Sequence, residues 1–157
     1  MFTFSILTAG ATKDPLIKGL QDKYIRYSKP FAKIETLSVK TTPFNSINER
    51  ERVTKIEAEL LLARTPKNTK IILLTEHGKT FTSENFSKQL LTWSEHESIH
   101  LTFIVAGPLG IHPSLQKVAT AELSLSPMTM PHELALIVLL EQLYRATTIL
   151  KQKTYHY

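Results

Sequence analysis

The chain of 157 residues is long enough for one domain with a sizeable core, and its 42% hydrophobic and 21% charged residues exclude a disordered, fibrous or membrane-spanning class. Cysteine is absent, which excludes disulfides, thiolate zinc sites and cysteine nucleophiles and is typical of a reducing compartment, so we expect a cytoplasmic protein. The net charge of +5 is uneven, because residues 1–70 contain 13 Lys and Arg against 7 Asp and Glu, whereas residues 71–157 contain 6 against 7.

The first half of the chain predicts strands and helices in alternation. Short β-prone runs are typical of strands, and apolar residues at three- and four-residue spacing are typical of amphipathic helices. Ser46 and Glu49 have capping-box spacing and open the second helix. Because no basic residue precedes the first apolar run, we expect no signal peptide. In order, the predicted elements are a strand at Phe2–Thr8, a helix at Asp14–Tyr27, a strand at Ala32–Val39 and a helix at Ser46–Arg64.

The second half continues the alternation with compact apolar strands. Pro131 suits the first turn of a helix, because its missing N–H would be unpaired there. The longest unbroken apolar run, Leu134–Leu140, is too short to span a bilayer. In order, the predicted elements are a strand at Lys70–Leu74, a helix at Ser83–Glu95, a strand at Leu101–Val105, a short helix at Pro113–Thr120, a short strand near Leu123 and a helix from Pro131 to about Leu150.

This alternation predicts a single α/β domain over residues 1–157, with a parallel-rich sheet flanked by helices. In such sheets ligands bind beyond the carboxyl ends of the strands. Three loops follow predicted strands in the second half of the chain, Leu74–Gly78, Ala106–Gly110 and Leu125–Met130. We therefore expect these loops to form the functional site.

The loops lack the usual signatures of phosphate, metal and hydrolase sites. No G-x-G-x-x-G or P-loop motif is present, no G-x-S-x-G elbow occurs, and the six histidines lack metal-binding spacing. The loops offer apolar side chains and backbone amides, which suit a neutral heterocycle held by main-chain hydrogen bonds. The predicted walls of that pocket are Leu74, Leu125, Met128 and Met130.

Several of these residues also have purely structural interpretations. The basic N-terminal half is either a phosphate-binding surface or a solvated surface that favours lysine. Methionines fill cores, glycines permit tight turns, and opposite charges four residues apart pair on helices. The structural alternatives are core packing for Met128 and Met130, a tight turn for Gly107 and Gly110, an ion pair for Glu141 and Arg145, and capping or packing at a helix N-terminus for His132.

Four segments together resemble the RlmH family of SPOUT-class RNA methyltransferases. They are AGPLG at 106–110, LSLSPMTMPHEL at 123–134, LLEQLYRA at 139–146 and the terminal YHY. The resemblance covers nearly the whole chain, and the block S-x-S-x-M-T-x-P-H followed by E-Q-L-Y-R-A is long and specific.

The resemblance implies a trefoil knot at the C-terminal end of the sheet, a homodimer, and S-adenosylmethionine as methyl donor. It also implies methylation of N3 of a pseudouridine in helix 69 of bacterial 23S ribosomal RNA, with no metal and no membrane involved. The C-terminal helix would then be apolar because one side packs on the sheet and another on the partner subunit. The implied cofactor contacts, with the glycines of the same turn, are Leu74, Ala106, Gly107, Gly110, Leu125, Ser126, Pro127, Met128, Thr129 and Met130.

Three positions depart from the family pattern. Ala106 occupies a position where the family usually has glycine, and its methyl group narrows the cofactor's approach unless its φ stays negative. Leu136 and Tyr157 occupy positions where the family usually has cations, which we expect to face RNA or substrate. Lys151 and Lys153 are candidates to replace these cations.

Methyl transfer to a pseudouridine N3 requires loss of its proton, so a base within hydrogen-bond reach is expected. The candidates are His156 and Tyr155, followed by His132, and Arg145 is expected to stabilise developing negative charge or to hold a phosphate. Without the resemblance, the terminal segment reads as a frayed end. Two alternatives stay open: a non-catalytic RNA- or ribosome-binding protein that keeps the fold, and a nucleotide-binding α/β domain of other chemistry. Whether the free subunit or the assembled ribosome is the substrate also stays open.

Overall fold

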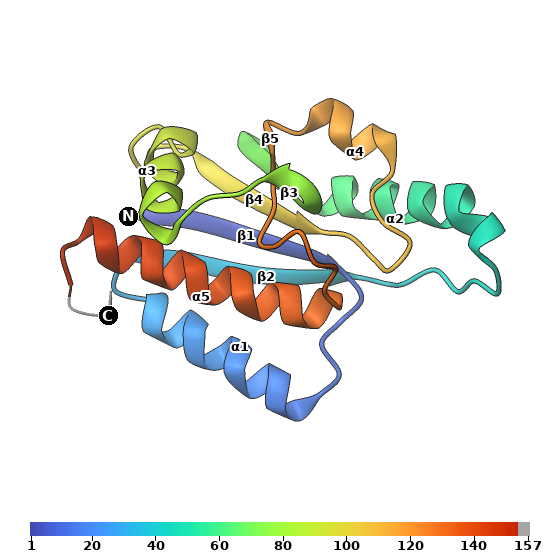
Figure 1. Cartoon of the computed structure of the whole chain (residues 1–157), viewed down its shortest axis with the longest axis horizontal. Helices are drawn as coiled ribbons and strands as arrows, with labels where there is room; N and C mark the ends of the chain where they lie inside the picture. The colour runs from blue at the N-terminus through green and yellow to red at the C-terminus, as the bar shows by residue number, and fades with distance from the viewer. Residues whose placement is uncertain (154–157) are drawn as a thin grey trace.

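The computed structural model describes residues 1–153 of the chain, and strands and helices alternate through this part (Figure 1). A short 3-10 helix, η1, precedes α2. The elements are β1 (Phe2–Ala9), α1 (Pro15–Ser28), β2 (Ala32–Val39), η1 (Ile47–Glu49), α2 (Arg50–Arg64), β3 (Thr69–Lys79), α3 (Ser83–Trp93), β4 (His100–Val105), α4 (Pro113–Val118), β5 (Ala121–Leu123) and α5 (His132–Leu150).

The strands form one sheet in the order β2-β1-β4-β3-β5, and every described pair of neighbours is parallel. The carboxyl ends of parallel strands meet at one edge of a sheet. The loops after β3, β4 and β5 therefore leave the sheet side by side, and the predicted parallel-rich α/β class is confirmed.

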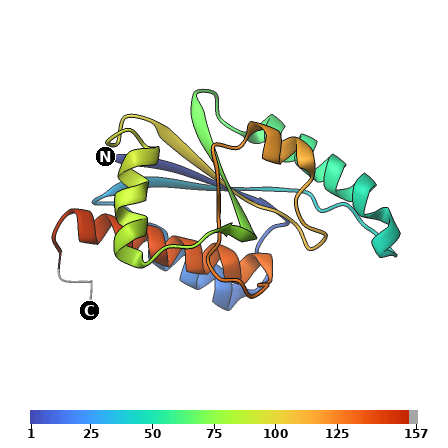
Figure 2. The ribbon, with the colours of Figure 1, turned by 45° about the horizontal axis from the view of Figure 1, so that its top comes forward.

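Helices cover both faces of the sheet, and the strands supply apolar side chains to each. Along β1, Phe2, Phe4 and Ile6 belong to one core, while Leu7 and Ala9 belong to the other. Successive side chains of a strand point to opposite faces, so a strand buried on both sides reads as a continuous apolar run. Figure 2 shows α2 and α4 on one side of the sheet and α1 and α5 on the other.

Helix α5 is apolar on nearly all sides because its own chain surrounds it. It packs on the sheet and contacts both α1 and α3, which flank it in Figure 1. Among the residues of α5, Leu134 alone is exposed, at 45%. The apolar composition of this helix is therefore largely explained within one chain, and the partner subunit stays a prediction.

Local capping explains where the helices begin. The Asp14 carboxylate accepts the Leu16 N–H at 2.8 Å at the start of α1, and Thr82 Oγ1 accepts the Asn85 N–H at 3.1 Å at the start of α3. The predicted capping box at Ser46 is present in a modified form. Ser46 Oγ accepts the Asn48 N–H at 3.2 Å and Glu49 Oε1 accepts the Asn45 N–H at 2.9 Å, so the segment starts as η1 before α2.

The structure corrects the predicted end of the third strand. Residues 75–78 were predicted as a turn, but β3 continues to Lys79 and pairs again with Leu123 after a register shift. A Cβ on Gly78 would lie 2.6 Å from the backbone carbon of Leu123, so the two strands approach too closely for a side chain. Smaller corrections are that α3 ends at Trp93, that α4 ends at Val118, and that Pro131 precedes α5 as its N-cap.

None of the helices within residues 1–153 combines the length and hydrophobicity needed to cross a bilayer. Within the same residues, no group of three or more His, Asp or Glu side chains is arranged to hold a metal ion.

Candidate functional site

A pocket of about 820 Å³ lies at the carboxyl edge of the sheet. Its walls come from residues 74–77 in the irregular second half of β3, from the loops after β4 and β5 and from the start of α5, with a further contribution from the η1–α2 segment. Nearly all predicted cofactor residues meet there, although Pro127 does not line the pocket. The predicted residues that do are Leu74, Ala106, Gly107, Gly110, Leu125, Ser126, Met128, Thr129 and Met130. Their role as cofactor ligands stays a prediction.

The loop after β4 forms a tight turn at the pocket wall. The Gly110 N–H donates to the Gly107 carbonyl at 3.0 Å, and Gly110 has a φ of +91°, a conformation that favours glycine. Ala106 does not have a positive φ, so its methyl group causes no backbone strain. The departure from the family's usual glycine at this position is therefore compatible with the turn.

Gly107 is required for a different reason, which is the close approach of a buried acid. A Cβ on Gly107 would lie 2.6 Å from Glu57 Oε2. Glu57 is 3% exposed, and its Oε1 accepts the Thr42 N–H at 3.4 Å. Burial raises the pKa of the Glu57 carboxyl above its ordinary value, and the hydrogen bond from Thr42 offsets part of that rise. Helix α2 thus presses a carboxyl group against the turn from behind.

Sequence reasoning missed Glu57, although a signal was present. Val53, Glu57 and Leu61 recur every four residues, and Val53 and Leu61 are each 1% exposed. An acid within such an apolar row is placed to be buried, and a buried acid requires a nearby partner or a raised pKa.

His132 lies at the start of α5 and lines the pocket. Its Nε2 is buried and has no hydrogen-bond partner among residues 1–153. A Cβ on Gly10 would lie 3.2 Å from this nitrogen, and Gly10 has a φ of +104°, so the loop after β1 packs against the imidazole. His132 is therefore a packed side chain with one free ring nitrogen beside the pocket.

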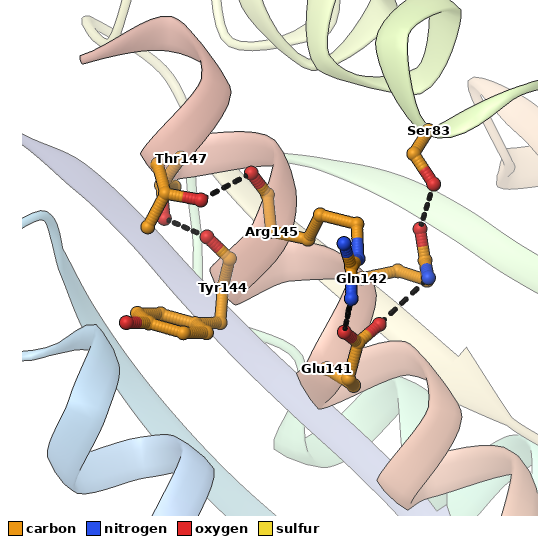
Figure 3. Close-up of polar contacts among 7 residues, drawn as sticks. Ser83, Glu141, Gln142, Tyr144, Arg145 and Thr147 are labelled. Atoms are coloured by element: carbon orange, nitrogen blue, oxygen red, sulfur yellow. Dashed lines mark hydrogen bonds and ion pairs between the residues drawn. The ribbon is translucent and has the colours of Figure 1, made fainter. Parts of the chain in front are cut away.

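The structure does not bring Arg145 to the pocket. Its guanidinium donates to Glu141 Oε1, with Nη2 at 2.7 Å, and Gln142 links that carboxylate to Ser83 at the start of α3 (Figure 3). The alternative prediction of an i,i+4 ion pair with Glu141 is confirmed. Arg145 belongs to a network that joins α5 to α3.

The remaining candidates divide between described and undescribed residues. Tyr155 and His156 lie outside the described residues, as does Tyr157. Leu136 is 3% exposed in the core, so its side chain does not face RNA as we expected of this position. Lys151 pairs with Glu97 at 3.0 Å, at the opposite end of α5 from the pocket.

The pocket also has residues that the sequence did not indicate, among them Ile47 and Arg50 of the η1–α2 segment. Among the described residues that line the pocket, Arg50 carries the positive charge of a basic side chain and Glu76 carries the negative charge of a carboxylate. Nothing in the local sequence separates Arg50 from other exposed helix cations, so only the tertiary structure reveals its position. The lining combines apolar side chains with polar ones such as Thr75, Ser126 and Thr129, an arrangement that can hold a neutral heterocycle.

Comparison with known proteins gives a consistent result over nearly the full length. A family described as "Predicted SPOUT methyltransferase" matches residues 2–156. The chain is 38% identical to the ribosomal RNA large subunit methyltransferase H of Ruminiclostridium cellulolyticum over 97% of this chain and 98% of that protein. It is 34% identical to the same-named protein of Maridesulfovibrio salexigens over 100% of this chain and 99% of that protein. It is 36% identical to the protein of this name from Streptococcus pneumoniae over 96% of this chain and 97% of that protein.

Among solved structures, the SpoU methyltransferase AviRb from Streptomyces viridochromogenes aligns with 98% of this chain and 62% of that chain, at 12% identity and a TM-score of 0.46.

Proposed function

This chain belongs to the SPOUT methyltransferases, in the family of the ribosomal RNA large subunit methyltransferases H, and we propose that it methylates N3 of a pseudouridine in helix 69 of bacterial 23S ribosomal RNA with S-adenosylmethionine as donor. The observation that carries the proposal is the meeting of three sequence-distant segments in one pocket, in a chain that matches these proteins from end to end. The absence of cysteine and the proposed substrate support a cytoplasmic location.

The residues of the pocket fit the proposed donor. The glycine turn lines the pocket, and the space that a Gly107 side chain would need is filled by the Glu57 carboxyl behind the turn. Leu74 and Leu125 provide apolar walls for a flat ring, and the pocket volume of about 820 Å³ accommodates a nucleoside with an attached amino acid. S-adenosylmethionine supplies a methyl group on a sulfonium, which is transferred by in-line displacement.

The chain's own residues orient the reactants and accept a proton. The turn at Gly107–Gly110 and the loop 125–130 would hold the donor, since both line the pocket. His132 stays a candidate to accept the N3 proton because it lines the pocket, although its unpartnered Nε2 is buried against the loop after β1. Tyr155 and His156 stay candidates for the same step. The ion pair of Arg145 with Glu141 supports a structural role for that arginine.

We also propose a homodimer and a knotted C-terminal segment, as the family resemblance implies. Exposed apolar residues follow one face of α1 at Leu16, Leu20 and Tyr27, which are 80%, 39% and 40% exposed, and Leu134 lies on the adjacent α5. A second copy covering this face would bury these side chains. Sedimentation of Leu16→Glu against wild type tests the dimer, with an increased monomer fraction expected. A variant that stays fully dimeric would exclude this face.

The function is tested with ribosomes from bacteria that lack the modification. Tritiated S-adenosylmethionine should label their 23S RNA when the protein is added, and mass spectrometry of helix 69 should place one added methyl on the pseudouridine. Free large subunits assayed in parallel identify the preferred substrate. Binding of S-adenosylhomocysteine without any transfer would instead favour a non-catalytic ribosome-binding protein.

A further inference from the structure

Arg50 is a cation at the mouth of the pocket. It is the first residue of α2, and its side chain is exposed. Among the described residues that line the pocket, no other is a lysine or an arginine. A Cβ on Gly110 would lie 3.3 Å from Arg50 Nη2, so the guanidinium lies over the glycine turn. This cation can reach a ligand that enters the pocket from solvent.

The acids next to Arg50 in the sequence are engaged with other partners. Glu49 pairs with Arg52 within the same turn, and Glu51 Oε1 lies 3.1 Å from His112 Nε2. Arg50 itself has no ion pair within residues 1–153. Its charge is therefore available to an incoming anion. Glu76 is the carboxylate among the described residues that line the pocket.

The surroundings of Arg50 favour a polyanion over a small acid. Residues 1–70 contain 13 Lys and Arg against 7 Asp and Glu. Lys13 follows β1 and Lys40 follows β2, and both are exposed and lack an ion pair within residues 1–153. Because the strands are parallel, these cations lie at the same edge of the sheet as the pocket. A phosphodiester chain can follow such an edge.

We propose that Arg50 binds a phosphate of the substrate RNA beside the nucleotide that enters the pocket. The guanidinium pairs with phosphate oxygens in a bidentate geometry that a lysine does not reproduce. This inference rests on the proposed function, since it assigns the RNA contact of that same site. Arg50 acts in binding the substrate and takes no part in the proton transfer.

The test compares Arg50→Gln with Arg64→Gln, which removes an exposed arginine at the other end of the same helix. Arg64 lies fourteen positions after Arg50 in α2, which is about 21 Å along the helix axis. Methyl transfer to ribosomes should show a KM about tenfold higher in Arg50→Gln, with kcat within about twofold of wild type. Its log KM should depend on log salt with a slope shallower by about one. Arg50→Lys should recover part of the loss, and Arg64→Gln should match wild type.

Calorimetry with S-adenosylhomocysteine separates the outcomes. The affinity of Arg50→Gln for this compound should equal that of wild type, which also establishes that the pocket is folded. Weakened S-adenosylhomocysteine binding with an unchanged ribosome KM would assign Arg50 to the cofactor and overturn the inference. Equal KM values and salt slopes for all variants would overturn it while the proposed function stands. A wild-type protein that labels no ribosomes would overturn both.

Discussion

The two edges of the parallel sheet differ in how their charged and polar side chains are paired. At the amino edge, several charged groups are paired with one another. Lys70 lies 2.7 Å from Glu95, and Glu97 accepts both Lys151 at 3.0 Å and the amino terminus at 2.6 Å. These charges are therefore engaged within the chain.

At the carboxyl edge, two polar groups of the pocket lining have no such pairing among residues 1–153. The imidazole Nε2 of His132 is buried and unpaired, and Arg50 has no ion pair, while the buried Glu57 carboxyl behind the glycine turn accepts the Thr42 N–H. Buried polar groups are normally satisfied, and exceptions concentrate at functional sites. The unpaired His132 nitrogen and the available Arg50 cation support the proposed site at the carboxyl edge, so we predict that substitutions there alter binding whereas those at the amino edge alter only stability.

The largest effect is expected from Leu125→Arg, at the inner wall of the pocket. A guanidinium in place of this half-buried leucine would occupy the apolar slot, so affinity for S-adenosylhomocysteine should fall at least about 100-fold by calorimetry. Leu60→Arg is the matched control, because Leu60 is 40% exposed on α2 and does not line the pocket. Unchanged affinity in Leu125→Arg would remove the pocket from the proposed mechanism.

A smaller loss is expected from Gly107→Ala. The new methyl group would lie 2.6 Å from Glu57 Oε2, so the turn or the carboxyl group must shift. Overpacking of this kind should weaken S-adenosylhomocysteine binding about tenfold. The neighbouring Ala106→Gly serves as control and should change affinity by less than about twofold, since Ala106 has no positive φ. If both variants bind equally well, the close approach of Glu57 does not control the turn.

The pH dependence of stability should distinguish Glu57 from a surface acid. The pKa of its carboxyl is raised in the folded state. As pH rises above the ordinary pKa of 4.5, this carboxyl loses its proton more readily in the unfolded chain than in the folded one. The free energy of unfolding therefore falls as pH rises from 4.5 through the raised pKa. Glu57→Gln should therefore be more stable than wild type at neutral pH, with the difference shrinking toward pH 4.5. Thermal melts across this range measure it, with exposed Glu59→Gln as control. A pH-independent difference would contradict the assignment.

His100 at the amino edge should give the opposite dependence. Burial lowers the pKa of this imidazole, whose Nε2 lies 3.0 Å from Ser5 Oγ. Stability is therefore present above the ordinary value of 6.5 and is lost as pH falls through the lowered value. His100→Gln should flatten this loss in denaturant titrations, with no change in S-adenosylhomocysteine affinity. The exposed His77→Gln should leave the loss intact.

The smallest effect is expected from Lys70→Gln. Its pair with Glu95 is solvent-exposed, and such pairs contribute at most about 1 kcal/mol to the free energy of unfolding. Denaturant titration should show a change within this limit that shrinks further in high salt. Altered methyl transfer in this variant would mean that the amino edge is not purely structural.

The sequence by itself determined the alternation of elements and the three segments that form the pocket, although the first of them, predicted as a loop, is the second half of β3. Strict alternation of strands and helices leaves few topologies, and parallel strands end at one edge, so Leu74, Ala106 and Leu125 were placed together without coordinates. The motif around 123–134 then indicated the family that the comparisons identify. These features are local or follow from chain order, and a sequence records both.

Only the tertiary structure decided which distant side chains meet at those loops. Arg50 and Glu57 reach the glycine turn from α2, Gly10 packs against His132 from the loop after β1, and Arg145 pairs with Glu141 on its own helix instead of lining the pocket. These contacts join residues far apart in the chain, and they depend on strand order and helix packing. A helical acid or arginine has the same local sequence whether it faces water or a neighbouring loop, so the fold alone gives each its role.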